Sequence, residues 1–373
     1  MSIVLDKMIN SVKASHEVLR EIRDKTGRGM IGYFHPVVPE ELIYAAGLHP
    51  VRFIPNFKDS ITIGNSYLQT YLCSYLRADF DQAISGKLPH LDGVIIPRSC
   101  EAVTFSYQTW KRHNPYEFID YLNVPWKKSD NTIGFFTKEL GRVKKNLEKF
   151  SGTKISEDSL RSAIELYNRN RGLLRALYDL RSDKAPPISG FETMNVVMSG
   201  FLFDKAEHNR LLDQLLKELP ERPSSPGAKA RLLISGGRVI DLRLWELIES
   251  AGPLIVADDV NNGSRSFWHS VEETTDDPLE ALARGYATVP CAFNTSIKDR
   301  FDFLSQMITE YKVNGVIFAI NLNCESEQFV YPELEKRIKE RFGIPTIHIE
   351  TDYLMGLAPL QDRVEAFLQL LKT

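Results

Sequence analysis

Two segments of the chain follow the same pattern, in which a short apolar run leads to a cysteine. Residues 91–100 read LDGVIIPRSC, and residues 313–324 read VNGVIFAINLNC. Each run is rich in β-branched residues and predicts a buried strand of a parallel sheet. Ligands of open α/β sheets collect beyond the carboxyl ends of the strands. The two cysteines are therefore expected at equivalent edges of two similar units, unless each is only a small buried hydrophobic residue.

Segments with strand-like and helix-like patterns alternate along both halves of the chain, which predicts parallel sheets covered by helices. Strands are predicted at 30–33, 51–54, 93–97, 118–122, 231–235, 254–257, 315–320 and 346–350. Helices are predicted at 5–23, 39–47, 68–85, 101–112, 204–219, 242–250, 278–284, 297–311, 332–342 and the carboxyl end, and the pattern is helical throughout 131–180. Because this helical stretch separates the two sets of strands, we expect two sheets.

The two strand-containing units also resemble each other in sequence. Residues 32–51 align without a gap with residues 237–256, so that Gly32 matches Gly237 and Gly47 matches Gly252. Chance matches between unrelated α/β units are the alternative explanation. The alignment favours an internal repeat, in which the two units share one topology.

These patterns predict an α/β fold with two doubly wound parallel-sheet domains that form a pseudo-repeat, plus a helical segment. The expected boundaries are 1–155 for the amino-terminal domain, 156–225 for the helical segment and linker, and 226–373 for the carboxyl-terminal domain. The stretch 220–227, rich in Pro and Ser, is the clearest linker.

Composition narrows the possible classes of function. The net charge is −3 and the chain has no basic stripe, so nucleic acid is not an expected partner. No apolar stretch approaches the ~20 residues that cross a bilayer, and the first 27 residues do not resemble a signal peptide. We therefore expect a cytoplasmic protein without a membrane partner.

Two nucleotide-binding patterns are absent or misplaced. The chain has no Gly-x-x-x-x-Gly-Lys-Ser/Thr loop, so we do not expect it to hydrolyse ATP itself. Gly27, Gly29 and Gly32 match the spacing of the dinucleotide fingerprint, but they follow a predicted helix and lead into a strand. The fingerprint requires the opposite order.

The four cysteines, Cys73, Cys100, Cys291 and Cys324, are far apart in the sequence. This spacing argues against a disulfide framework, and structural zinc sites usually contain close cysteine pairs. Distant thiolates that tertiary structure brings together fit an iron–sulfur cluster better. Three thiolates would leave one iron without a protein ligand, as in an open catalytic metal site.

Five segments together resemble a known family, the iron–sulfur subunits of 2-hydroxyacyl-CoA dehydratases and benzoyl-CoA reductases. The resemblance covers nearly the whole chain, from about residue 32 to 352. It is carried by PEELIYAAGLHPV at 39–51, CSYLR at 73–77, DGVIIPRSC at 92–100, the run 315–324 and the run 343–353.

The resemblance implies two α/β domains with a helical domain, and one 4Fe–4S cluster held by Cys73, Cys100 and Cys324. Cys291 is then a spare thiol near the site or a fourth ligand. The resemblance also implies a related second subunit, with a homodimer as the alternative. A separate iron–sulfur activator is expected to hydrolyse ATP and to donate one low-potential electron for chemistry on an acyl-CoA.

The family's reactions explain this design. One electron added to the thioester carbonyl gives a ketyl radical anion, which expels the α-hydroxyl group and makes the β-proton acidic. Reduction of benzoyl-CoA uses the same low-potential electron. We expect a dehydratase subunit first, since residues 256–265 look more like that branch, whereas the helical run 160–180 resembles the reductase branch equally well. A non-catalytic electron-relay protein is the third possibility.

Five further residues are candidates near the cluster. His35 follows a predicted strand and is a candidate proton donor, unless it is a turn histidine with satisfied hydrogen bonds. Ser74 and Ser99 adjoin cysteines and are candidates to donate hydrogen bonds to cluster sulfurs, with local turn bonding as the alternative. Arg77 and Arg98 are candidates to offset cluster charge or to contact CoA phosphates, but we expect both at the solvated surface.

Overall fold

The computed structural model describes residues 2–371 apart from 55–58, 89, 114, 223–229, 294–295 and 354. Within these residues the strands form two separate four-stranded parallel sheets. The first has the order β2-β1-β3-β4 and contains β1 (Met30–Tyr33), β2 (His49–Arg52), β3 (Gly93–Pro97) and β4 (Phe118–Leu122). The second has the order β6-β5-β7-β8 and contains β5 (Arg231–Gly236), β6 (Leu254–Asp259), β7 (Gly315–Asn321) and β8 (Thr346–Thr351).

The two sheets have the same strand order, so the predicted fold class is confirmed and the internal repeat is visible in the topology. Gly47 and Gly252 both end a helix with positive φ, at +76° and +106°, in the left-handed region that favours glycine. Gly32 and Gly237 are not equivalent, because Gly32 pairs with Val51 inside the first sheet whereas Gly237 lies just beyond β5.

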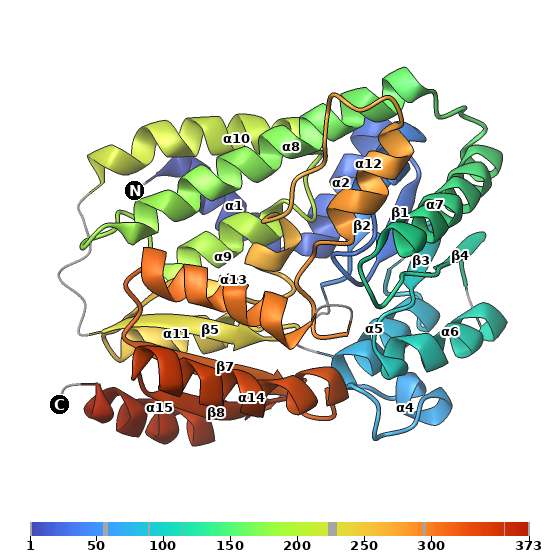
Figure 1. Ribbon diagram of the computed structural model, residues 1–373. Helices are drawn as coiled ribbons and strands as arrows, with labels where there is room; N and C mark the ends of the chain where they lie inside the picture. Colours follow the sequence, from blue (N-terminus) through green and yellow to red (C-terminus); the bar gives the residue numbers. More distant parts are fainter. Residues whose placement is uncertain are drawn as a thin grey trace.

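Helices pack on both sheets, and four further helices form a separate helical layer (Figure 1). The first unit contains α2 (Ser15–Thr26), α3 (Glu40–Ala45), α4 (Ile63–Tyr67), α5 (Ser74–Ile84), α6 (Glu101–His113) and α7 (Asp130–Ser151). The second contains α11 (Leu242–Ser250), α12 (Pro278–Tyr286), α13 (Ile297–Glu310), α14 (Glu325–Phe342) and α15 (Ala358–Leu370). The helical layer contains α1 (Ile3–Lys13), α8 (Glu157–Asp179), α9 (Gly190–Ser199) and α10 (Lys205–Glu218).

Two helices pack across the expected domain boundaries. α1 lies against α9 of the helical layer, and its Met8 joins the core that covers the second sheet. α12 lies between β6 and β7 of the second sheet in sequence but packs on α7 and α8, where Leu282 joins the core of the first sheet. The boundaries at 155 and 225 separate the two sheets and remain a proposal. The linker sequence 220–227 lies largely outside the described residues.

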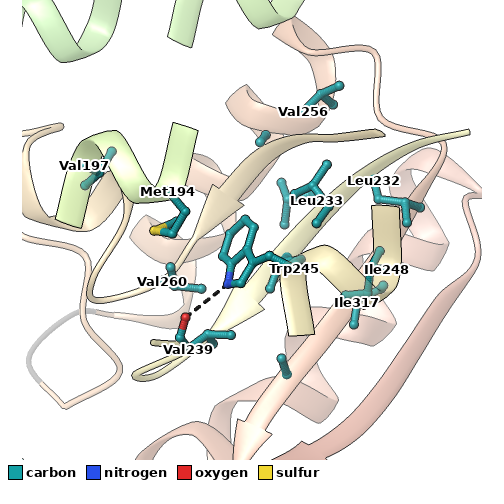
Figure 2. Packing of buried hydrophobic residues seen from close by; sticks show 14 of the residues in the cluster. Met194, Val197, Leu232, Leu233, Val239, Trp245, Ile248, Val256, Val260 and Ile317 are labelled. Atoms are coloured by element: carbon teal, nitrogen blue, oxygen red, sulfur yellow. Dashed lines mark hydrogen bonds between the residues drawn. The ribbon is translucent and has the colours of Figure 1, made fainter. Parts of the chain in front are cut away.

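A buried tryptophan ties the helical layer to the second sheet. Trp245 of α11 is fully buried and donates a hydrogen bond from Nε1 to the carbonyl oxygen of Val239, at 3.2 Å. Figure 2 shows its ring beside Val260 and Leu233, with Met194 of α9 nearby. Since α9 buries most of its residues here, the second sheet and the helical layer share one hydrophobic core.

All eight predicted strands are confirmed to within two residues, but several helices differ. The 68–85 helix begins only at Ser74, so that Cys73 precedes it, and the 332–342 helix begins at Glu325 and contains Pro332. The stretch 131–180 divides at Gly152, which has φ +69°. In the part of the chain that the structure describes, no helix is long and apolar enough to cross a membrane.

Candidate functional site

The four cysteines line one cavity of about 70 Å³, where the carboxyl ends of the two sheets face each other. His35 follows β1 and Cys100 follows β3 of the first sheet, whereas Asn261 follows β6 and Cys324 follows β7 of the second. The cavity therefore lies at the strand edge where open α/β sheets bind ligands.

Cys73, Cys100 and Cys324 share one local position, because each directly precedes a helix. They stand before α5, α6 and α14 respectively. The first amides of a helix are unpaired within it and carry partial positive charge, which favours an anion at this end. Three helix N-termini are thus directed at one cavity, each with a thiol at its tip.

Burial dominates the acid–base properties of these thiols. It raises the pKa of Cys100 to about 12, with Glu325 adding to the shift and the amide of Val103 opposing it. It also raises the pKa of Cys73, against the amides of Leu76 and Tyr75. The pKa of Cys324 is raised well above its usual value by burial, Glu327 and the other two thiols. Without a bound cation the three groups are neutral thiols at pH 7, so a metal would displace three protons.

The donors around the cavity are thiols. Within the described residues, no three His, Cys, Asp or Glu side chains form a group that could hold a metal ion. Soft thiolates spread around a cavity suit an iron–sulfur cluster.

Cys291 lies on the wall formed by His35 and Asn261. Its Sγ is 3.3 Å from His35 Nε2 and 3.6 Å from Asn261 Oδ1. Asn261 Nδ2 lies 3.2 Å from the same Nε2, and Asn261 Oδ1 accepts a hydrogen bond from Arg265. The amide group therefore donates to Nε2, and the ring proton of His35 belongs on Nδ1.

His35 is a neutral imidazole in this environment. Burial lowers its pKa well below the usual value, and Arg52, Arg265 and Arg238 lower it further. Nδ1 is buried and has no hydrogen-bond partner among the described residues. The alternative expected from the sequence was a turn histidine with satisfied hydrogen bonds. Only Nε2 satisfies that description, because Nδ1 has no partner in the described part of the chain. The role of proton donor stays a prediction, and it would use the neutral ring.

A buried ionic network supports this wall and was not found from the sequence. Arg265 Nε lies 2.5 Å from Asp259 Oδ1, and Arg265 Nη1 lies 2.9 Å from Glu327 Oε1. Arg300 bridges the same two carboxylates at 3.1 Å and 2.7 Å. Burial alone would raise the pKa of Asp259, but Arg265 and Arg300 outweigh it and lower that pKa. The charges of the two arginines and two carboxylates cancel. The only hint of this network in the sequence was the pair of acidic residues, Asp258 and Asp259, that follows a predicted strand.

A second ion pair joins the two units beside the cavity. Arg238, which follows β5, contacts Asp79 of α5 and donates to the carbonyl oxygen of Phe53 at 2.9 Å. Asp79 is fully buried. The pair fixes the loop after β5 against the helix that begins beside Cys73.

The remaining sequence candidates have other partners. Ser74 donates to Asp352 and accepts from the amide of Tyr353 at 3.2 Å, so it ties α5 to the loop after β8. Ser99 Oγ is buried without a hydrogen-bond partner in the described part of the chain. Arg77 is buried and donates to the carbonyl oxygen of Leu72 at 3.0 Å, so its expected place at the solvated surface was wrong. Arg98 is half-buried and stacks over Trp126 at 4.3 Å.

Comparison with known proteins shows which proteins the chain is related to. Residues 36–371 match the family model described as 2-hydroxyglutaryl-CoA dehydratase, D-component. The beta subunit of (R)-phenyllactyl-CoA dehydratase from Clostridium sporogenes is 28% identical, over 98% of this chain and 99% of the relative. A subunit of benzoyl-CoA reductase from Thauera aromatica is 26% identical, over 92% of this chain and 91% of the relative.

The chain is also similar, more distantly, to an alpha subunit. The alpha subunit of (R)-2-hydroxyglutaryl-CoA dehydratase from Acidaminococcus fermentans is 21% identical, over 73% of this chain and 58% of the relative. The family model covers most of the chain, and the phenyllactyl-CoA dehydratase and benzoyl-CoA reductase relatives match nearly all of it. The chain therefore belongs to the family of the 2-hydroxyglutaryl-CoA dehydratase D-component, which it shares with subunits of 2-hydroxyacyl-CoA dehydratases and benzoyl-CoA reductase.

Proposed function

We propose that the chain is a subunit of a 2-hydroxyacyl-CoA dehydratase and holds one 4Fe–4S cluster through Cys73, Cys100 and Cys324. The observation that carries the proposal is the convergence of these thiols, each at the N-terminus of a helix, on one cavity between the two sheets. The relatedness to dehydratase subunits supports the reaction class.

The chain's own residues would hold and shield the group. The amides of three helix N-termini would stabilise thiolate charge, and the balanced network of Arg265, Asp259, Glu327 and Arg300 would add rigidity without excess charge. When bound, the cluster would supply the single low-potential electron that ketyl-type elimination of an α-hydroxyl group requires. Neutral His35 lines the same cavity, and its Nδ1–H, which has no hydrogen-bond partner among the described residues, would be available to donate a hydrogen bond or a proton.

The partners belong to the same proposal. The similarity to an alpha subunit supports assembly with a related second subunit, and a homodimer is the alternative. A separate iron–sulfur activator would hydrolyse ATP and reduce the cluster, and the substrate would be an acyl-CoA. The chain itself would be cytoplasmic. The interface between two α/β domains supplies the buried site that such one-electron chemistry needs.

Two other functions are supported by specific observations. The 26% identity to a benzoyl-CoA reductase subunit over 92% of the chain supports a ring-reducing enzyme. Cys291 on the same cavity wall supports a fourth thiolate ligand, which would close the cluster and make the chain an electron relay.

Iron content tests the ligand assignment. Anaerobically purified protein should be brown and contain roughly four irons per chain, as one cubane cluster requires. Cys73→Ser, Cys100→Ser and Cys324→Ser should each lose most of the iron and visible absorption, because a thiolate ligand is removed. Cys291→Ser is the matched control and should keep both. Full iron content in Cys100→Ser would overturn the assignment, and bleaching of Cys291→Ser would favour the closed relay site.

A further inference from the structure

A second cavity, of about 30 Å³, adjoins the cysteine site. Tyr33 and Pro36 line it, whereas Phe34 and His35, the two residues between them, line the cysteine cavity. Its other walls include β2, α3, α8, the end of α9, the start of α10, residues 266–267 and Tyr286 of α12, so it lies where the first sheet meets the helical layer.

Two buried side chains of this cavity have unused hydrogen-bond donors. Arg52 of β2 is 3% exposed, and neither Nη1 nor Nη2 has a hydrogen-bond partner among the residues described. Tyr167 of α8 is 4% exposed, and its hydroxyl group likewise has none. Buried polar groups are almost always paired, so three unused donors around one cavity require an explanation.

The other charged groups at this cavity are already paired. Lys205 lies 3.0 Å from Glu40, and Arg171 lies 2.6 Å from Glu41. Arg52 contributes the remaining positive charge, with the ring of Phe201 4.7 Å from its Cζ as partial compensation. Burial lowers the pKa of Arg52 to about 10, which still leaves the group protonated at pH 7. An unpaired buried cation is strongly unfavourable.

We propose that this cavity binds a small monoanion of carboxylate size, held by the Arg52 guanidinium and the Tyr167 hydroxyl group. A planar carboxylate presents two oxygens to the two Nη groups, which is the geometry that guanidinium groups bind best. The cavity has room for about two water-sized groups, which suits formate and excludes a long acyl chain. This site does not depend on the cluster assignment.

Thermal unfolding and calorimetric titration of the purified full-length chain with sodium formate test the proposal, against sodium sulfate at equal ionic strength. Formate should raise the wild-type Tm in a saturable way, by roughly 2–4 °C, and should bind with a measurable Kd. Arg52→Met should bind formate at least tenfold more weakly, and Tyr167→Phe a few-fold more weakly. Arg210→Met, at an exposed arginine, should respond like the wild type.

The outcomes are distinct. No formate binding by the wild type would mean that water alone fills the cavity and would overturn the proposal, as would an equal response in wild type and Arg52→Met. If Arg52→Met does not fold, Tyr167→Phe decides, and unchanged formate affinity in that variant overturns the assignment.

Discussion

At the scale of single residues, His208 shows how a buried side chain fixes its own protonation state. Its Nε2 lies 3.1 Å from the carbonyl oxygen of Val196, and its Nδ1 lies 2.8 Å from the side-chain nitrogen Nδ2 of Asn170. The first contact requires a donor and the second an acceptor, so the ring is neutral. Burial, with a smaller contribution from Lys205, lowers the pKa of His208 to about 3.

This histidine should make folding acid-sensitive. Its pKa is near 6.5 in the unfolded chain and lower in the folded one, so between these values only the unfolded state binds the proton. The stabilisation is therefore complete above pH 6.5 and falls as pH decreases toward 3. We expect the unfolding free energy of His208→Gln, measured in urea between pH 6 and 4.5, to depend on pH less steeply than the wild type, by about 1.4 kcal/mol per pH unit.

The matched control is His113→Gln, at the partly exposed end of α6. It should keep the wild-type slope. Equal slopes for wild type and His208→Gln would show that His208 takes up a proton in the folded state.

At the scale of elements, glycine has opposite effects at the end of α7 and inside α8. Gly152 ends α7 with φ +69°, and Gly172 lies inside α8, and an added Cβ at either position meets no atom within 4 Å. Gly152→Ala should destabilise the protein by about 1 kcal/mol, because alanine is strained at positive φ. Gly172→Ala should stabilise it by roughly 0.5–1 kcal/mol, because alanine is the better helix former.

Urea denaturation measures both changes, and each variant is the control for the other. Since neither site has steric contacts, the opposite signs depend on backbone conformation alone. Equal signs would contradict this interpretation.

β3, β5, β6 and β7 were predictable because each contains a short apolar run that is buried on both faces, a pattern that depends little on distant partners. β4 and β8 are only partly buried. α9 was not predicted, because nearly all its residues are buried and the helical periodicity is lost. A local signal was present in Ser189 and Glu192, which form a capping box. The start of α14 was misplaced because Pro332 was interpreted as a first-turn proline, although it lies inside the helix.

The sequence indicates the positions of the cysteines better than it indicates the charged residues around the cavity. Cys100 and Cys324 follow predicted strands, so their meeting at the sheet edges could be expected. Arg238 and Glu327 give no such signal, because their importance comes from partners far away in the sequence. Long-range pairing of buried charges is a property of the folded chain and has no local periodicity.

At the scale of the whole molecule, the pair of Arg238 and Asp79 joins the two units. Arg238→Met would leave Asp79 buried without its cation, so we expect a loss of about 3–5 kcal/mol in unfolding free energy. Arg238→Met with Asp79→Asn removes both charges and should lose less than the two single changes together, with a coupling above about 1 kcal/mol.

Lys298→Met, in the exposed pair with Asp302, is the control and should change stability by less than about 1 kcal/mol. Strict additivity of the two changes at Arg238 and Asp79, measured by urea denaturation, would show that the pair contributes nothing specific to the contact between the units.

The electron balance of the assembled enzyme distinguishes its two candidate reactions. Removal of water from a 2-hydroxyacyl-CoA leaves no net oxidation or reduction, so an electron used to start the elimination is recovered at the end. Reduction of an aromatic ring consumes two electrons for every product. With the second subunit, the activator and a 2-hydroxyacyl-CoA under strict anaerobiosis, we expect product to exceed the ATP hydrolysed by a wide margin. ATP use in proportion to product, with benzoyl-CoA as the accepted substrate and no activity on 2-hydroxyacyl-CoA, would place the chain in the reductase branch.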